Sequence, residues 1–437
     1  MKVIREPGKE QWEEILARPT QRFEQLEDTV REVFKEVQQQ GDRAVLKFTA
    51  KFDGLALDDM KVPADVIESR AKDVPDALKQ AIELAKSNIT KFHKAQVSER
   101  ISVETSPGVR CWQEKRPIEK VGLYIPGGSA PLFSTVLMLA IPAGIAGCKE
   151  VILCTPPSRD GEIDPAICYA AKSCGIDKIF KVGGIQAVAA MTFGTETIPA
   201  VYKIFGPGNQ YVTVAKQWAT RYGIAIDMPA GPSELMVVAD ESAEAAFVAS
   251  DLLSQAEHGP DSQVILVATS ESLLSSVAGE LQKQLSLLPR KDIAEKAISN
   301  SKFIYVSTEE QVAELINAYG PEHLIVCMEA EEFIVNRIIN AGSVFLGNYT
   351  PESAGDYASG TNHTLPTNGY ARQYSGVNLD SFTKSITFQK ITADGMETIG
   401  SAIEIMAEAE GLQAHKNAVT LRLREIAKNN PESALNN

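Results

Sequence analysis

Apolar residues recur every three or four positions among polar ones in the first third of the chain. The segment 21–48 has this pattern, with Gly41 as an interruption, and the segment 79–97 has a looser version of it. Because this is the period of a helix with one buried face, the first third is predicted to be mostly helical and polar on its outer side. His93 lies in the second segment and is predicted to be an exposed helix residue without a role.

From about residue 120 the pattern changes to short β-branched runs that alternate with helical segments. Several of these runs end at glycine- or proline-rich turns. Such alternation indicates an α/β fold, in which a parallel sheet has helices on both faces. The predicted strands are 121–125, 151–154, 178–182, 201–205, 235–238, 264–268, 303–306, 324–326 and 344–346, and a polar helical tail is predicted from about Thr392.

One stretch is long and apolar enough to raise the question of a membrane span. Residues 121–148 carry no charge over 28 positions, a length that can cross a bilayer. Pro126, Pro131 and Pro142, together with several glycines, interrupt it. We therefore expect a buried strand, a tight turn and a buried helix.

Charge and cysteine content narrow the possible partners and compartment. The chain has 43 Lys and Arg against 57 Asp and Glu, a net charge of −14. So acidic a surface disfavours nucleic acid and anionic membranes as partners. The six cysteines include no Cys-x-x-Cys pair and fit reduced thiols in the cytoplasm. Cys148 and Cys154 are interpreted as small buried residues, since no partner that would stabilise a thiolate lies beside them.

Glycine-rich turns follow three of the predicted strands between residues 127 and 208. Glycine lets backbone N–H groups approach a phosphate, and the next helix adds a positive end. Gly206 and Gly208 supply the first two glycines of a dinucleotide fingerprint, but Tyr211 stands where the third belongs and Asp227 follows about twenty residues on. Alone this signal is weak, because sharp strand–helix turns also explain it.

Two of the five histidines lie in patterns that suggest chemistry. Gln255 and His258 are three positions apart on a predicted helix that Gly259 ends, so both are expected on one face of its last turn. Glu322 and His323 are adjacent, immediately before an apolar strand. A carboxylate beside an imidazole offers two proton-transfer groups of different resting charge.

The remaining candidates for metal binding are dispersed along the chain. His363 follows closely after Asp356, and His415 lies on the predicted tail helix. A structural imidazole is the alternative for each histidine alone, and no local zinc motif such as His-Glu-x-x-His occurs. Asp, Gln and His ligands from distant segments would suit zinc, and manganese or cobalt also.

Seven short motifs together resemble the histidinol dehydrogenase family. They occur in family order from about residue 120 to 415, and the first third of the chain is similar in a looser way. The motifs are Gly122-Leu-Tyr-Ile-Pro-Gly-Gly-Ser129, Gly206-Pro-Gly-Asn209, Met228-Pro-Ala-Gly-Pro-Ser-Glu234, Ser254-Gln-Ala-Glu-His-Gly259, Gly320-Pro-Glu-His323, Gly355-Asp-Tyr-Ala-Ser-Gly-Thr-Asn-His363 and Leu412-Gln-Ala-His415. No position expected to be functional departs from the family pattern.

The resemblance implies a fold and a division of the chain. The fold would be α/β, with two similar three-layer α/β/α domains of the aldehyde-dehydrogenase type, a helical N-terminal arm and a helical C-terminal tail. The arm would be residues 1–25, and the tail, residues 378–437, would serve dimerisation. Residues 26–120 with 237–377 would form the domain that carries the metal and acid–base residues, and residues 121–236 would bind NAD.

The resemblance also implies an activity. The family carries out the zinc-dependent, four-electron oxidation of L-histidinol to L-histidine through histidinaldehyde, with two NAD, in the last steps of histidine biosynthesis. It implies a cytoplasmic homodimer with one Zn²⁺ per subunit, in which each tail completes the partner's site. The implied catalytic residues are Glu322 and His323; the metal ligands are Gln255, His258, Asp356 and His415; the substrate contacts are Ser233, Gln255, His258, His323, Asp356, Glu410 and His415; and the NAD contacts are Tyr124, Gln186 and Asn209.

These residue types fit the implied chemistry. Hydride loss from an alcohol needs a base for the hydroxyl proton, which neutral His323 can provide. The aldehyde must then be hydrated, and Glu322 can activate that water. Zinc holding the substrate's imidazole and amine would orient it, and Glu410 suits a polar or cationic ligand.

Three other functions remain open on the sequence. A related zinc-dependent alcohol dehydrogenase for another polar alcohol, such as a sulfonated diol, would keep the metal and acid–base residues, although Glu410 disfavours an anionic substrate. A metal hydrolase would use Glu322 to activate water and would not bind a nicotinamide. The glycine-rich strand ends disfavour this function. A catalytically silent nucleotide- or metal-binding protein is the third.

Overall fold

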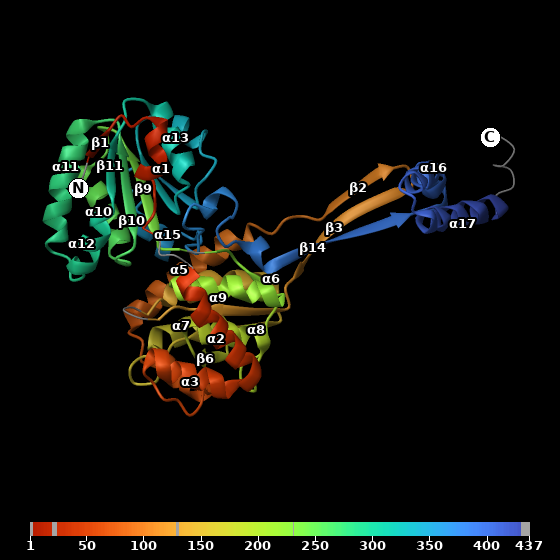
Figure 1. Ribbon diagram of the computed structural model, residues 1–437, viewed down its shortest axis with the longest axis horizontal. Coiled ribbons are helices and arrows are strands. Elements are labelled where there is room, and N and C mark those ends of the chain that lie inside the picture. Colours follow the sequence, from red (N-terminus) through yellow and green to blue (C-terminus); the bar gives the residue numbers. More distant parts are fainter. Residues whose placement is uncertain (1–2, 20–23, 128–130, 230, 430–437) are drawn as a thin grey trace. The chain divides into compact units, whose positions relative to one another are not determined.

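The structure, a computed structural model, divides into two compact units (Figure 1). It describes residues 3–19, 24–127, 131–229 and 231–429. The first unit combines residues 1–96 with 118–382, and the second combines residues 97–117 with 383–437. The first unit contains two parallel sheets, of six and five strands, and the second contains a three-stranded antiparallel sheet.

The six-stranded parallel sheet and its helices form what we call the six-stranded lobe. Its strands, in spatial order, are β1 (Val3–Arg5), β11 (Lys302–Tyr305), β10 (Gln263–Ala268), β9 (Glu234–Ala239), β12 (His323–Cys327) and β13 (Ser343–Leu346). Its helices are α1 (Trp12–Ile15), α10 (Ala245–Ala256), α11 (Glu271–Leu285), α12 (Lys291–Ser299), α13 (Glu309–Tyr319), α14 (Glu331–Val335) and α15 (Glu352–Tyr357).

Alternating side chains explain why this sheet is covered on both faces. In β9, Leu235 and Val237 enter the core beneath α10–α12, whereas Met236 and Val238 enter the core beneath α1, α13 and α14. All four side chains are completely buried. A strand buried on both faces is apolar at every position, as the sequence of β9 is after Glu234.

The five-stranded parallel sheet and its helices form the five-stranded lobe. Its strands, in spatial order, are β6 (Ile179–Lys181), β5 (Glu150–Thr155), β4 (Lys120–Tyr124), β7 (Lys203–Phe205) and β8 (Ala225–Ile226). Its helices are α2 (Glu24–Gln40), α3 (Asp42–Asp53), α4 (Ala64–Lys72), α5 (Asp76–Lys94), α6 (Phe133–Ala146), α7 (Pro165–Ser173), α8 (Gly184–Phe193) and α9 (Gln210–Ala219). Helices α2, α3, α8 and α9 share one core, and α4–α7 share the other.

The N-terminal part of the chain contributes to both lobes. Strand β1 pairs with β11 in the six-stranded sheet, whereas helices α2–α5 pack against the five-stranded sheet. We therefore correct the expected grouping of residues 26–120 with 237–377: residues 26–94 belong with the five-stranded lobe. The apolar helix faces predicted from the sequence are real, but helical periodicity does not say which sheet a face will cover.

The second unit is a small antiparallel sheet followed by a helical pair. The strands, in spatial order, are β14 (Thr383–Ile391), β3 (Val109–Pro117) and β2 (Ile101–Ser106), and the helices are α16 (Ala393–Ala409) and α17 (Gln413–Asn429). Trp112 and Phe388 stack across β3 and β14 with ring centroids 5.3 Å apart. The sheet leaves apolar side chains on its surface, with Ile101 60% exposed and Val103 51% exposed.

Most elements predicted from the sequence are present, with local differences. All nine predicted strands form, and the α/β class with helices on both sheet faces is confirmed, as is the helical tail. The helix predicted over 21–48 is two helices, because Gly41 adopts φ +53° between them. Strands β2, β3 and β14 were not predicted, since their side chains are mostly exposed or half-buried and give no run of apolar residues. The short strands β1 and β8 were also missed.

His93 is the clearest local error. It is completely buried rather than exposed, and its Nδ1 hydrogen-bonds to the carbonyl oxygen of Ile89 at 2.9 Å. Its Nε2 lies 3.4 Å from the side-chain nitrogen of Asn362. Flanking lysines suggested a surface, but His93 occupies the inward face of α5.

The apolar stretch 121–148 contains the expected strand, β4, and the expected helix, α6. The turn expected between them includes residues 128–130, which lie outside the described ranges. Within the described ranges, we find no helix with both the length and the apolar character that crossing a membrane requires.

Candidate active site

Glu322 and His323 lie side by side where β12 begins, and both are buried. The Oε2 of Glu322 accepts a hydrogen bond of 2.9 Å from the backbone N–H of Glu234, the first residue of the neighbouring strand β9. Glu322 Oε2 is also 3.8 Å from the Nδ1 of His323. The structure thus brings the predicted acid–base pair to the amino ends of two adjacent parallel strands.

Two further carboxylates surround the imidazole of His323. Its Nδ1 lies 3.9 Å from Oε1 of Glu352, and its Nε2 lies 3.7 Å from Oδ1 of Asp356. Both acids come from the short helix α15, where a separation of four residues places them on one face. Asp356 was predicted from the sequence, and Glu352 was missed. The spacing of four from Asp356 is the signal that would have pointed to it.

Donor groups of the kind that bind metals meet next to this pair. Ligand atoms of His258, Glu352 and Asp356 all lie within 4.8 Å of one another. Gln255, from the last turn of α10, places its Nε2 3.3 Å from Nδ1 of His258. Helix α10 ends at Ala256, so His258 follows in the turn rather than on the helix.

Several oxygens in this cluster are buried without an internal partner. Oε1 of Gln255 and both carboxylate oxygens of Glu352 accept no hydrogen bond from any described residue. A buried polar atom left in this way costs free energy unless something else satisfies it. Oxygen and nitrogen donors without thiolates match zinc, manganese or cobalt, so these residues fit a divalent metal ion.

Burial and the charges of neighbouring side chains shift the pKa values of the acid–base pair. Burial raises the pKa of Glu322 to about 8. Burial also opposes the charged form of His323, but the surrounding carboxylates of Glu352, Glu322 and Asp356 outweigh it and raise the pKa of His323 to about 10. Positive charge held by the same carboxylates would lower the pKa of His323 towards the range of a neutral base.

His363 has a supporting position. Its Nδ1 hydrogen-bonds to the backbone oxygen of Asp356 at 2.9 Å, and its Nε2 lies 3.1 Å from Oγ1 of Thr135 on α6. The preceding Asn362 donates to the backbone oxygen of Met138 at 2.6 Å. These bonds tie the segment that follows Asp356 to helix α6 of the five-stranded lobe, which agrees with a structural role for this imidazole.

The other predicted substrate contacts occupy two places. Ser233 is half-buried immediately before β9, and its backbone oxygen accepts a 3.2 Å hydrogen bond from the N–H of Gln263. Glu410 and His415 belong to the second unit, around the turn between α16 and α17, and their side chains are exposed there. Motif residues 128, 129 and 230 lie outside the described ranges.

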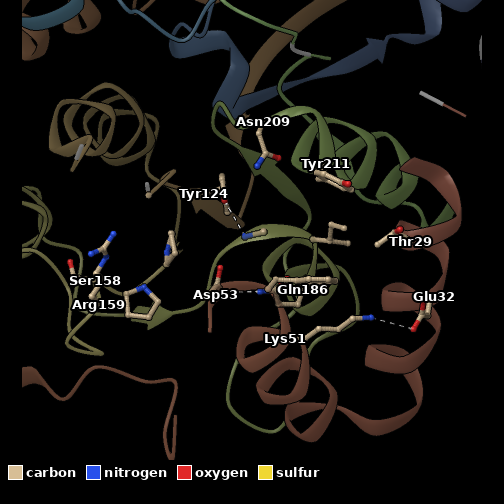
Figure 2. Close-up of a pocket in the computed structure, with 16 residues that line it drawn as sticks. Thr29, Glu32, Lys51, Asp53, Tyr124, Ser158, Arg159, Gln186, Asn209 and Tyr211 are labelled. Carbon is tan, nitrogen blue, oxygen red and sulfur yellow. Dashed lines mark hydrogen bonds and ion pairs between the residues drawn. The ribbon is translucent and has the colours of Figure 1, made fainter. Parts of the chain in front are cut away.

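The three predicted NAD contacts line one cavity of about 710 Å³ in the five-stranded lobe (Figure 2). Tyr124 ends β4, Gln186 lies in the first turn of α8, and Asn209 precedes α9. A cavity of this volume is in the range of small-molecule and cofactor sites. It opens at the carboxyl ends of the parallel strands, where ligands bind in most open α/β sheets.

Backbone groups shape this cavity. The Tyr124 hydroxyl accepts a 3.1 Å hydrogen bond from the N–H of Gly184, and the side-chain oxygen of Asn209 caps α9 by accepting from the N–H of Val212 at 3.1 Å. Helices α8 and α9 therefore begin beside the cavity, and their positive ends favour phosphate. Oε1 of Gln186 is buried without a hydrogen bond from any described residue, while its Nε2 donates to Asp53 at 3.2 Å.

Asp227, which follows the glycine-rich turn by about twenty residues, binds backbone N–H groups and a lysine. Its Oδ2 accepts from the N–H of Gly206 and its Oδ1 from the N–H of Met228, both at 2.7 Å. Lys216 forms an ion pair with the same carboxylate and donates to the carbonyl oxygen of Gly206 at 2.7 Å. The buried pair of Lys216 and Asp227 therefore fixes the backbone of the 206–209 turn at Gly206. Gly206 is required there, because a Cβ would lie 2.0 Å from the backbone oxygen of Tyr124.

The thiols show no sign of a catalytic role. Cys154 is completely buried, and burial raises the pKa of the half-buried Cys148 to about 11. Neither thiol is therefore poised to ionise near neutral pH.

Fold and site together define an α/β enzyme with an acid–base pair beside metal-type donors and a separate pocket suited to a nucleotide. Comparison with known proteins gives the family. The sequence profile of histidinol dehydrogenase matches residues 16–423. Curated relatives named histidinol dehydrogenase include one from Bacteroides fragilis strain YCH46, 60% identical over 428 residues (98% of this chain, 100% of the relative), and one from Vibrio parahaemolyticus, 51% identical over 425 residues (97% and 98%).

A solved structure agrees with these sequence matches. The crystal structure of histidinol dehydrogenase from Elizabethkingia anophelis is 55% identical, with a TM-score of 0.95 over 98% of both chains. The chain belongs to the histidinol dehydrogenase family, and it is an oxidoreductase. The family resemblance read from the seven motifs is confirmed.

Proposed function

We propose that the protein oxidises L-histidinol to L-histidine through histidinaldehyde, with two NAD and a bound zinc ion, as the last steps of histidine biosynthesis. The observation that carries this proposal is the arrangement at the start of β12. There, Glu322 and His323 lie beside His258, Glu352 and Asp356 in a chain of the histidinol dehydrogenase family.

His323 is the base of the first oxidation. Its imidazole is held among carboxylates on both ring nitrogens, which fixes its orientation and stabilises the charge it gains on taking the hydroxyl proton. This imidazole would take the hydroxyl proton when the alcohol carbon is oxidised, and NAD, when bound, would supply the acceptor for the hydride. His323 itself is only 3% exposed, which limits the access of water to this base.

Glu322 acts in the second oxidation, where histidinaldehyde must add water before a second hydride can leave. Burial raises the pKa of its carboxyl to about 8, so it can both accept and return a proton near neutral pH. Its fixed hydrogen bond from Glu234 N–H keeps one oxygen in place.

The metal ion would be held by Gln255, His258, Asp356 and His415, and Glu352 lies among these donors in the first unit. When bound, the metal supplies positive charge that orients the substrate's imidazole and amine. Ser233 and Glu410 complete the substrate contacts, and Glu410 suits a cationic amine.

NAD would occupy the cavity lined by Tyr124, Gln186 and Asn209. The starts of α8 and α9 suit a pyrophosphate. Glycine allows the turns beside the cavity to pack closely, because a larger residue at Gly127 would collide with Pro156 and one at Gly206 with the backbone oxygen of Tyr124.

A homodimer would allow the second unit to deliver Glu410 and His415 to the partner's site. The exposed apolar side chains of that unit support such an interface: Ile405 and Met406 are each 65% exposed, and Leu421 is 55% exposed. Apolar side chains on one small unit are typical of association surfaces.

The deciding experiment is the NADH yield per L-histidinol at completion, before and after removal of metal by a chelator. Two NADH per substrate, lost on chelation and restored by zinc, would support the proposal. One NADH, or activity indifferent to chelation, would contradict it. No NADH from a correctly folded protein would favour another polar alcohol as the substrate.

Glu322→Gln separates the two half-reactions. We expect aldehyde oxidation to fall at least about 100-fold, while alcohol oxidation falls much less, because only the second step needs an activated water. The rate at which the first NADH forms from histidinol before steady state, and the rate of NADH formation from histidinaldehyde supplied separately, measure this. Equal losses in both would refute the division of labour.

A further inference from the structure

A buried ion pair lies behind the acid–base site and includes a residue from the N-terminal segment. Arg18 donates from Nη2 to Oε1 of Glu234 at 2.9 Å, and its Nε donates to the other carboxylate oxygen. Only 15% of the Arg18 side chain and 2% of the Glu234 side chain are exposed. Such a two-pronged pair fixes the direction of both side chains, because the planar guanidinium matches the carboxylate in only a few orientations.

Further hydrogen bonds lock this pair in place. The hydroxyl of Tyr319 lies 3.2 Å from Oε2 of Glu234 and 2.8 Å from Oε1 of Gln263. Arg18 Nη2 also donates to the backbone oxygen of Tyr319 at 2.8 Å, and its guanidinium lies 4.0 Å from the centre of that ring. Gln263 in turn donates to the backbone oxygen of Ala17 at 2.9 Å. The network therefore joins the N-terminal segment to the start of β9, the start of β10 and the end of α13.

This network meets the site through the backbone of Glu234. The same residue whose side chain binds Arg18 donates its N–H to Oε2 of Glu322. Ser233, a proposed substrate contact, is the residue before it. Strand β9 also pairs with β12 in a register that sets Leu235 opposite His323. A shift at Glu234 would thus move the Glu322 carboxylate and Ser233 together.

We propose that Arg18 is a positioning residue of the active site, acting through Glu234 to hold the N–H that orients Glu322. Arg18 does not bond to Glu322 or His323 in the described structure; its effect passes through the carboxylate and backbone of Glu234. The N-terminal segment that carries it is therefore part of the catalytic apparatus as well as an edge of the six-stranded sheet. This inference rests on the proposed role of Glu322 in aldehyde oxidation.

The test compares both half-reactions in Arg18→Met, which keeps the length and apolar stem of the side chain and removes the guanidinium. NADH formation is measured separately from histidinol and from histidinaldehyde in the zinc-loaded enzyme, with the folded fraction checked by circular dichroism. We expect the kcat for histidinaldehyde to fall between about 10- and 100-fold, the loss that small misplacements of a catalytic group produce. The rate of the first oxidation of histidinol, measured as formation of the first NADH before steady state, should fall several-fold less, because His323 does not depend on this N–H. A structural defect alone would lower both rates equally.

Arg5→Met is the matched control. Arg5 belongs to the same N-terminal segment and forms a similar two-pronged pair with Glu271, with hydrogen bonds of 3.0 and 3.3 Å. Both side chains are largely exposed, Arg5 to 58% and Glu271 to 53%. The pair lies on the surface, and we expect both half-reactions to stay within about twofold of the wild type.

Two more variants keep the test decisive if Arg18→Met folds poorly. Tyr319→Phe removes one hydroxyl from the network and should shift the ratio of the two rates in the same direction by about threefold. Arg18→Lys restores the charge without the second prong and should give a ratio between those of wild type and Arg18→Met.

The outcomes separate this inference from the proposed function. If the wild type forms NADH from both substrates and the variants lower both rates in equal proportion, Arg18 has only a structural role and the inference is wrong. If the wild type forms no NADH from either substrate, the proposed function itself is wrong. A selective loss of histidinaldehyde oxidation in Arg18→Met, with Arg5→Met unchanged, supports the inference.

Discussion

The two lobes of the first unit are built on parallel sheets, but their candidate sites use opposite ends of the strands. In the five-stranded lobe the cavity lies at the carboxyl ends, where α8 and α9 begin. In the six-stranded lobe the acid–base site lies at the amino ends of β9 and β12, near which α10 and α13 end. The same architecture therefore presents helix starts to one ligand and helix ends to the other.

This difference has an electrostatic consequence. Helix starts carry partial positive charge and favour anions such as a pyrophosphate, whereas helix ends carry partial negative charge and favour cations. A divalent metal and a protonated amine are both cations, so the amino edge of the six-stranded sheet is the suitable end for them. Backbone groups shape the first site, and titratable side chains shape the second.

The largest expected effect comes from removing the base of the acid–base site. His323→Asn should lower histidinol oxidation by about 10³-fold, since general base catalysis contributes on that order. NAD binding, measured by calorimetry, should stay unchanged, because the nucleotide pocket belongs to the other lobe. Activity within tenfold of the wild type would show that another group takes the proton.

The cavity of the five-stranded lobe should instead be sensitive to loss of the buried ion pair between Lys216 and Asp227. Lys216→Met leaves Asp227 charged and buried, since these side chains are 3% and 0% exposed. We expect the free energy of unfolding to fall by about 3 kcal/mol and the KM for NAD to rise as the 206–209 turn loosens. Urea denaturation and initial rates measure the two effects.

Lys283→Met is the control for that variant. Lys283 pairs with Glu280 at 3.2 Å on the surface, where 71% of its side chain is exposed. Its loss should change the free energy of unfolding by less than about 0.5 kcal/mol. A similar loss of stability in both variants would contradict a special role for the buried pair.

A smaller, pH-dependent effect is expected at Asp251, one turn before Gln255 on α10. Burial raises the pKa of this carboxyl from 3.8 to about 7. Between about pH 4 and pH 7 the unfolded chain has lost this proton and the folded protein retains it, so stability falls as the pH rises through this window.

Asp251→Asn removes that dependence. The full shift corresponds to about 4 kcal/mol; because the side chain keeps 8% exposure, we expect water to reduce the effect to about 2 kcal/mol. The variant should gain stability over the wild type progressively from pH 4 to pH 7 and by a constant amount above it. Thermal unfolding across this range measures the gain, and an equal difference at pH 4 and pH 7 would contradict the assignment.

Residues of the candidate sites were predictable where they lie close to one another in the sequence. Glu322–His323 and the pair Gln255 and His258 are close in the chain, so their types and spacing were visible. Glu352 escaped notice because a lone glutamate in a polar segment resembles a surface residue until burial is known. Arg18 escaped for a different reason, since its partner Glu234 is 216 positions away.

The sequence by itself determined the family, nine of the strands and most of the residues of both candidate sites, because these depend on local order and spacing. Only the tertiary structure decided that residues 26–94 cover the five-stranded sheet, that His93 is buried, and that Asp227 binds Lys216 and Gly206. It also decided which strand ends face each site. Periodicity records that a face will be buried, whereas the identity of the surface that buries it depends on contacts between segments far apart in the chain.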